Sequence, residues 1–225
     1  MIQFDRVSKH NPGCSRAVAD VSFTIDLGSK VFLTGHSGAG TSTLLRLEMI
    51  LEWASRGQVI VNDLNLSQAP DKVATQVRRG TGMIFQDHKL LKDKTVADNV
   101  ALPLMIAGLK YVDIRKRVRA ALDKVGLLEK ENAWPLTLSG GEQQRVGIAR
   151  GIVAMPPLIL ADEPTGNLDP SLSRELFGFF NEISRQGATV LIASHDLNLI
   201  RQMRKRVLVL SNGRLADDIP AGDGS

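Results

Sequence analysis

A glycine-rich segment near the N-terminus has the residue types and the spacing of a loop that holds phosphate groups. It follows an apolar run at residues 31–34 and leads into a run of helical character. Glycines let successive backbone N–H groups turn towards one anion, and the N-terminus of the following helix adds positive charge. The residues of this candidate cradle are Gly35, His36, Ser37, Gly38, Ala39, Gly40, Thr41, Ser42 and Thr43.

One position of this loop departs from the pattern for phosphate binding. The pattern has lysine directly after the last glycine, where its ammonium group bridges the outer phosphates. Residue 41 is threonine instead, and a hydroxyl cannot supply that charge. Ser42 can still offer its hydroxyl to Mg²⁺. Taken alone, the segment is interpreted equally well as a glycine-rich turn without a ligand.

Two acids follow the apolar run at residues 158–161. Asp162 and Glu163 are predicted at the carboxyl edge of a parallel sheet, beside the phosphate loop. There Asp162 would hold Mg²⁺ through water, and Glu163 would orient and polarise the attacking water. Acidic strand ends are also common as loop starts, so this pattern gains its weight from the loop upstream.

A second helix start combines a capping residue with glycines. Ser139, Gly140, Gly141 and Glu142 open a predicted helix, whose N-terminus can bind an anion without a phosphate loop. The alternative is an ordinary N-cap. Two glycines lower helix propensity at this point, and we therefore favour a functional role.

These segments need a scaffold of strands and helices. Short β-branched or apolar runs predict strands at residues 2–7, 21–25, 31–34, 59–61, 83–85, 158–161, 189–193 and 207–210. Helical periodicity at 170–185 and 197–204 predicts an α/β fold with a mostly parallel sheet covered by helices. The first two strands favour an antiparallel addition at the N-terminus.

The segment 93–154 interrupts this alternation with three helical patterns and no strand. The clearest apolar stripe is formed by Ile114, Val118, Leu122 and Val125. We therefore expect one domain, with a core at about 1–87 and 156–225 and an all-helical subdomain at about 88–155.

The composition of the 225 residues, with 43% apolar and 23% charged, permits a sizeable core. The longest apolar stretch, residues 100–109, falls short of the roughly 20 residues that a spanning helix needs. One cysteine and no signal-peptide pattern favour a cytoplasmic setting. A net charge of +4 fits an anionic partner, which could be nucleotide, acidic lipid or nucleic acid.

The motifs together resemble those of the ABC ATPase family. Residues 139–145 resemble its signature motif, Gln86 its Q-loop, residues 167–169 its D-loop and His195 its switch histidine. The similarity is closer still to the FtsE family of bacterial cell-division ATP-binding proteins and covers nearly the whole chain. The resemblance implies a RecA-like P-loop NTPase core.

The resemblance also implies roles and partners. Two ATP molecules would be sandwiched in a homodimer that forms on ATP binding, each between one phosphate loop and the other subunit's Ser139 motif. Catalysis would involve Gln86 and His195, with Gln86 also a ligand of Mg²⁺, and the nucleotide would contact Asn11 and Asp169. The implied partner is a polytopic membrane protein resembling FtsX at the cytoplasmic face of the bacterial inner membrane; no nucleic acid is expected.

This sequence departs from the family at three places. Besides Thr41, the loop after the first strand lacks the aromatic residue that stacks on adenine and offers only His10. Loss of the stacking residue costs roughly 1 to 3 kcal/mol of binding free energy, and loss of the lysine's charge-assisted hydrogen bond costs roughly 1.5 to 3 kcal/mol. Together they predict weak ATP binding and little hydrolysis. In the helix after the phosphate loop, Glu48 lies among apolar residues, and the family has glycine near Ile50. Either Glu48 faces solvent or this helix packs differently.

Several alternatives stay open. Within the class, the chain would be the ATP subunit of a lipoprotein-releasing or macrolide-type exporter. A non-hydrolysing scaffold or regulatory subunit is favoured by Thr41, and a nucleic-acid-binding ATPase only by the basic pI. The basic residues of the helical segment favour a solvated face over lipid binding, and they are Lys110, Arg115, Lys116, Arg117 and Arg119.

Overall fold

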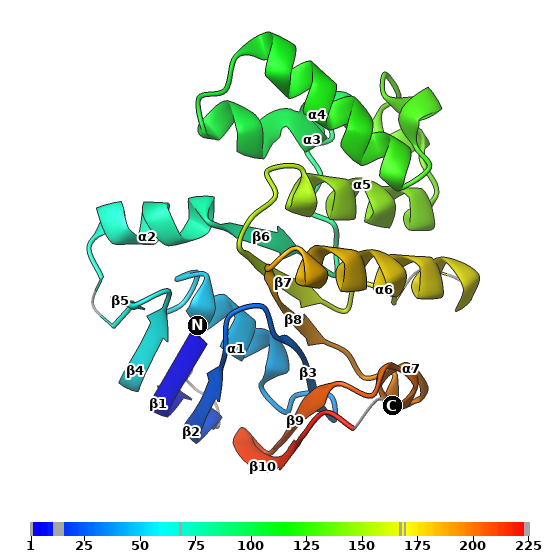
Figure 1. Cartoon of the computed structure of the whole chain (residues 1–225). Coiled ribbons are helices and arrows are strands. Elements are labelled where there is room, and N and C mark those ends of the chain that lie inside the picture. Colours follow the sequence, from blue (N-terminus) through cyan, green and yellow to red (C-terminus); the bar gives the residue numbers. More distant parts are fainter. Residues whose placement is uncertain (1, 11–15, 68, 167, 169, 223–225) are drawn as a thin grey trace. The chain divides into compact units, whose positions relative to one another are not determined.

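The computed structural model describes residues 2–10, 16–67, 69–166, 168 and 170–222 (Figure 1). Contacts divide the chain into two compact units. The first comprises Met1–Arg78 with Asn181–Ser225, and the second comprises Arg79–Phe180.

The N-terminal strands of the first unit form an antiparallel sheet in the order β2-β1-β4-β5. Its strands are β1 (Ile2–His10), β2 (Arg16–Ile25), β4 (Arg56–Val61) and β5 (Leu64–Asn65). In β1, Ile2, Phe4 and Val7 are buried, and the Phe4 ring stacks on Phe23 with centroids 4.6 Å apart. The predicted antiparallel addition is thereby confirmed.

The second sheet of this unit has the phosphate-loop strand between two parallel neighbours. Strand β3 (Lys30–Gly35) pairs with β8 (Thr189–Ala193) and β9 (Arg206–Ser211), and β10 (Arg214–Ile219) adds an antiparallel edge. Every residue of β8 is buried, as expected for a parallel strand covered on both faces. The helices of this unit are α1 (Thr41–Glu48) and α7 (Leu197–Met203), and α2 (Asp71–Arg79) ends at its border.

In the second unit, two parallel strands accompany the helices. Strand β6 (Thr81–Ile84) pairs with β7 (Leu158–Asp162). The helices are α3 (Val96–Ile106), α4 (Tyr111–Lys124) and α5 (Gly140–Ile152), with the short turns η1 (Leu128–Lys130) and η2 (Pro135–Thr137). Helix α6 (Pro170–Arg185) begins in this unit. Between residues 93 and 154 the structure has helices and no strand, as predicted.

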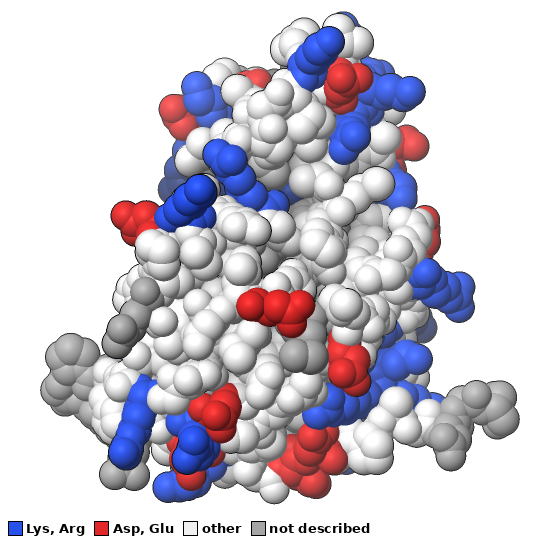
Figure 2. Space-filling view, turned by 60° about the vertical axis from the view of Figure 1, so that its left-hand side comes forward, with Lys and Arg blue, Asp and Glu red and all other residues white. Residues whose placement is uncertain are grey.

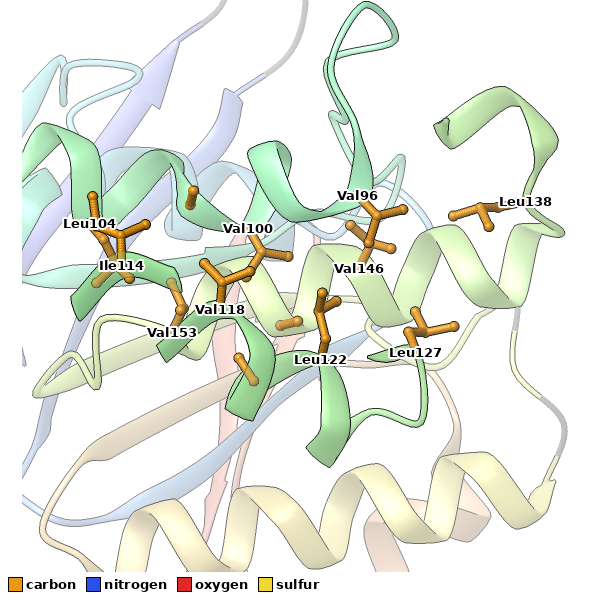
Figure 3. Packing of buried hydrophobic residues seen from close by; sticks show 13 residues of the cluster. Val96, Val100, Leu104, Ile114, Val118, Leu122, Leu127, Leu138, Val146 and Val153 are labelled. Carbon is orange, nitrogen blue, oxygen red and sulfur yellow. The ribbon is translucent and has the colours of Figure 1, made fainter. Parts of the chain in front are cut away.

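Apolar side chains from α3, α4 and α5 form the core of this helical region (Figure 3). The stripe predicted on α4 is confirmed, because Ile114, Val118 and Leu122 are buried in this cluster and Val125 packs against it. Thr95 begins α3 with a capping box, in which its side chain accepts from the backbone N–H of Asp98. Thus local caps and the 3.6-residue period together place these helices.

Two glycines let helix α5 lie directly on strand β6. A Cβ on Gly82 would collide with the carbonyl oxygen of Gly151, and a Cβ on Gly151 would lie 2.9 Å from the Ile84 side chain. This close approach sets the distance between the strand that precedes Gln86 and the helix that follows Ser139.

Within the described residues, none of the helices combines the length and the apolar character that crossing a bilayer requires.

Candidate functional site

The predicted phosphate loop links β3 to α1 in the first unit. Gly38 and Gly40 have φ angles of 80° and 104°, which non-glycine residues rarely adopt. Helix α1 begins at Thr41 without a side-chain cap and without an acidic residue in its first turn. The positive end of the helix is therefore not offset by a carboxylate of its own, which suits an anion.

Neighbouring backbone groups hold this loop in shape. The N–H of Ala39 donates to the carbonyl oxygen of His36 at 2.9 Å, and the N–H of Gly213 donates to the carbonyl oxygen of Ala39 at 3.1 Å. Gly40 lies against β2, where an added Cβ would be 2.5 Å from the carbonyl oxygen of Ala17. The glycines are thus required by conformation and by space.

His195 lies at the same edge of the sheet as the phosphate loop. Strands β3 and β8 run parallel, with Leu33 opposite Ala193, so their carboxyl ends lie side by side. The N–H of Ser194 continues this pairing by donating to the carbonyl oxygen of Leu33 at 3.0 Å. The His195 side chain is exposed. The structure therefore brings the predicted switch histidine and the loop to one edge.

The second unit carries a corresponding edge with the predicted acids. Strands β6 and β7 pair in parallel, with Ile84 opposite Ala161. Gln86 and the pair Asp162 and Glu163 therefore follow adjacent carboxyl ends. Glu163 has a φ of 46°, a left-handed backbone that is uncommon for its residue type. Such local strain often accompanies a functional position, and the sequence alone did not indicate it.

Ser139 is the N-cap residue of helix α5, so this helix begins where the sequence predicted. Its side chain accepts from the N–H of Glu142 at 3.3 Å, and the N–H of Ser139 donates to the Glu142 carboxylate at 2.9 Å. Lys130 of η1 donates to the same carboxylate. These hydrogen bonds, that of Lys130 first, lower the pKa of Glu142 to about 2. No described atom lies within 4 Å of a Cβ added to Gly140.

Arg150, on the same helix as the capped serine, contacts the segment after Gln86. It donates to the carbonyl oxygens of His88 and Lys89, and these two residues have φ angles of 61° and 46°. Burial lowers the pKa of Arg150. Residue patterns alone do not indicate a role for Arg150 or Lys130, because neither position stands out by periodicity or local motif.

The helix after the phosphate loop buries the carboxylate of Glu48. Glu48 is 1% exposed, neither of its carboxylate oxygens has a hydrogen-bond partner among the described residues, and burial raises its pKa well above 4.5. Two residues later, Ile50 has a φ of 53°. The alternative in which Glu48 faces solvent is therefore wrong, and the apolar run around it accounts for its burial.

The predicted site residues thus fall into two described groups. The loop from Gly35 to Thr43 and His195 belong to the first unit, and Gln86, the Ser139 helix start and the two acids belong to the second. Asn11, Asn167 and Asp169 lie outside the described residues.

Comparison with known proteins identifies the family of a chain that has this loop and these helix starts. Residues 18–166 match the family described as ABC transporter. The chain belongs to the ABC transporter family. This match spans the phosphate loop, Gln86, the Ser139 motif and both acids, while His195 follows it. Hydrolysis of ATP is the activity of the ATPases of this family.

Individual ABC proteins are similar over nearly the whole chain. The cell division ATP-binding protein FtsE of Escherichia coli K12 is 53% identical over 215 residues, covering 96% of this chain and 97% of the relative. A dimeric structure of MJ0796, a bacterial ABC transporter cassette, is 31% identical with a TM-score of 0.93 and full coverage of both chains. A post-hydrolysis structure of MJ0796 bound to ADP and Pi is 30% identical, with the same score and coverage.

Proposed function

We propose that this chain is the ATP-binding subunit of a bacterial cell-division complex of the FtsE type. The observation that carries the proposal is the uncapped start of α1 behind a loop with left-handed glycines, in a chain 53% identical to a cell division ATP-binding protein. Such a loop presents backbone N–H groups to an anion, and a nucleoside triphosphate is the anion that the ABC family binds.

In this proposal the phosphate loop and the acids at positions 162 and 163 enclose a triphosphate with its Mg²⁺. The hydroxyl of Ser42, the amide oxygen of Gln86 and the carboxylate of Asp162 would hold the metal. All three are oxygen donors, which suits a hard cation such as Mg²⁺. The metal would neutralise charge on the phosphates, while Glu163 and His195 would orient the attacking water and contact the transferring phosphoryl group.

A second copy of this chain would complete each site. Ser139 and Gly140 are exposed at the start of α5, and the space around Gly140 would let the outer phosphate of a nucleotide approach the backbone N–H groups there. The homodimer would therefore form on ATP binding. The similarity to a dimeric ABC cassette supports this arrangement.

Thr41 sets the expected strength of binding. Without the lysine ammonium, the chain loses a charge-assisted hydrogen bond worth about 1.5 to 3 kcal/mol, and the transition state loses positive charge as well. ATP binding should be weak and hydrolysis slow. The same residue favours a second function, in which the chain acts as a non-hydrolysing scaffold of the membrane complex.

The experiment compares this chain with Thr41→Lys by titration calorimetry with Mg-ATP and by phosphate release. Thr41→Lys should bind ATP about 10- to 100-fold more tightly and should release phosphate faster. Adding Glu163→Gln to Thr41→Lys should keep binding and abolish release. Absence of ATP binding in both chains would overturn the assignment, and a low-micromolar dissociation constant for the unchanged chain would show that another cation replaces the lysine.

The proposed partner is a polytopic membrane protein resembling FtsX, which would hold the chain at the cytoplasmic face of the inner membrane. Pull-down from solubilised bacterial membranes with and without ATP tests this part. We expect the pull-down to recover one polytopic protein, in an amount that differs with and without ATP. A chain that recovers no membrane protein under either condition contradicts it.

A further inference from the structure

The turn between α3 and α4 exposes several large apolar side chains together. We name residues 105–112 the hairpin tip. Within it, Met105, Ile106, Tyr111 and Val112 are 59%, 60%, 77% and 78% exposed. Single exposed apolar residues are normal on a protein surface. Four lie within eight successive positions, and exposed large apolar residues gathered in this way are typical of a binding site.

The backbone of the turn presents these side chains as one group. Helix α3 ends when the N–H of Gly108, with a φ of 77°, donates to the carbonyl oxygen of Met105 at 3.0 Å. The N–H of Leu109 then donates to the carbonyl oxygen of Leu104 at 3.1 Å, and Leu109 packs against the helical core. The hairpin tip is therefore anchored from inside while its apolar residues face outwards.

Helix α4 continues the exposed surface with basic side chains. Its opposite face is buried through Ile114 and Val118. Side chains four positions apart lie on one face of a helix, so Arg115 follows Tyr111 and Lys116 follows Val112 along the exposed side. All four of these side chains are exposed. Each exposed apolar residue in the first turn of α4 is thus followed by a basic residue four positions later on the same face.

Positive charge dominates this region. Between residues 105 and 119 the sequence has five basic residues and one acid, Asp113. Arg119 pairs with Glu131. The other four bases have no ion-pair partner in the described part of the chain, and they are Lys110, Arg115, Lys116 and Arg117. Figure 2 shows blue side chains around white surface in the upper part of the view, where α3 and α4 lie in Figure 1.

We propose that the hairpin tip binds directly to a membrane surface of acidic phospholipid. The exposed apolar residues, one of them a tyrosine, suit the acyl-chain boundary of a lipid surface. The lysine and arginine residues next to them suit the phosphates of the headgroups. The bases would contact lipid phosphates, and Tyr111 would lie at the boundary with its hydroxyl towards water. This goes beyond the proposed function, because a membrane protein could hold the chain without any lipid contact.

The test is co-sedimentation of the full chain with phosphatidylcholine vesicles, with and without phosphatidylglycerol, in the absence of nucleotide. Binding should be at least about tenfold stronger with the acidic lipid and should weaken as salt screens the attraction. Lys110→Glu with Lys116→Glu should abolish the preference. Tyr111→Ser with Val112→Ser should remove the binding that persists at high salt. All four positions are exposed, so the variants should fold, and thermal melting checks this.

The matched control makes the same charge change in a second exposed basic cluster, which comprises Arg201, Arg204 and Lys205. Arg201→Glu with Lys205→Glu should leave vesicle binding within about twofold of the unchanged chain. Equal loss in this control would overturn the proposal, since net charge alone would then explain binding. Absence of binding to acidic vesicles would also overturn the proposal. If the tip variants then fail to recover a membrane protein in the pull-down, the hairpin tip binds a protein partner instead. Neither result bears on ATP binding.

Discussion

The guanidinium group of Arg150 donates a hydrogen bond of 2.7 Å to the backbone carbonyl oxygen of Lys89. A second hydrogen bond from Arg150 reaches the carbonyl oxygen of His88. The helix that begins beside Ser139 is thereby tied to the segment that follows Gln86. The contact therefore joins the elements that carry two motifs more than fifty residues apart in the sequence.

Replacement of Arg150 by alanine should destabilise the protein. Two carbonyl oxygens lose a charged donor, so the free energy of unfolding should fall by about 2 to 3 kcal/mol, measured from urea denaturation. Arg150→Lys should recover only part of this loss, because a single ammonium group replaces the planar guanidinium group. The exposed Arg174→Ala is the control. A similar midpoint for Arg150→Ala and Arg174→Ala would show that the contact is unimportant.

Replacement of Glu48 by leucine should stabilise the protein near neutral pH. The buried carboxylate has no hydrogen-bond partner in the part of the chain that the structure describes, and its pKa is raised, so ionising it in the folded state costs free energy. The contribution of Glu48 to stability should be most favourable below pH 4.5, where its carboxyl group is protonated in the folded and the unfolded chain. It should fall as pH rises towards the pKa of the folded state. Glu48→Leu should add roughly 1 to 3 kcal/mol at pH 8.

The measurement compares urea denaturation at pH 5 and pH 8 for both chains. The gain from Glu48→Leu should be larger at pH 8 than at pH 5. The exposed Glu129→Leu is the matched control and should change stability little at either pH. A gain that is the same at both values would mean that ionisation of Glu48 is not the cause.

Gly40→Ala should impair both folding and ATP binding. Its φ of 104° and the carbonyl oxygen of Ala17, 2.5 Å from an added Cβ, leave no room for a side chain. The cost should be about 2 kcal/mol or more. Gly178→Ala on α6 meets nothing within 4 Å and should instead stabilise by roughly 0.5 to 1 kcal/mol. Thermal melting and ATP titration report the two effects; unchanged ATP binding in Gly40→Ala would place the nucleotide elsewhere.

Lys130→Met should raise the pKa of Glu142 from about 2 towards its ordinary value of 4.5. A lowered carboxyl pKa contributes stability above 4.5 that is lost as pH falls towards 2. The variant should therefore lose part of this pH dependence and fray the start of α5. NMR titration of the Glu142 carboxyl group measures the shift, and Lys130→Arg should preserve it. An unchanged pKa in Lys130→Met would assign the effect to the capping box alone.

Most strands and helices followed from residue patterns, and the exceptions have physical reasons. Strand β10 is largely exposed and contains two aspartates, so it lacks the apolar alternation that predicts a strand. Helix α2 has two buried residues, Ala74 and Val77, in nine positions and offers a weak stripe. Both elements are stabilised by what they pack against, which local propensity does not report.

The sequence by itself determined the motifs, since glycine spacing, capping residues and strand-end acids are local features. It was enough to predict the phosphate loop, the Ser139 helix start and the defect at Thr41. Only the tertiary structure decided that Glu48 is buried, that Lys130 holds Glu142 and that Arg150 contacts Lys89. Periodicity shows which face of a helix is apolar. Whether that face is covered, as in the core of α4, or left open, as at the hairpin tip, depends on chain segments that pack from elsewhere.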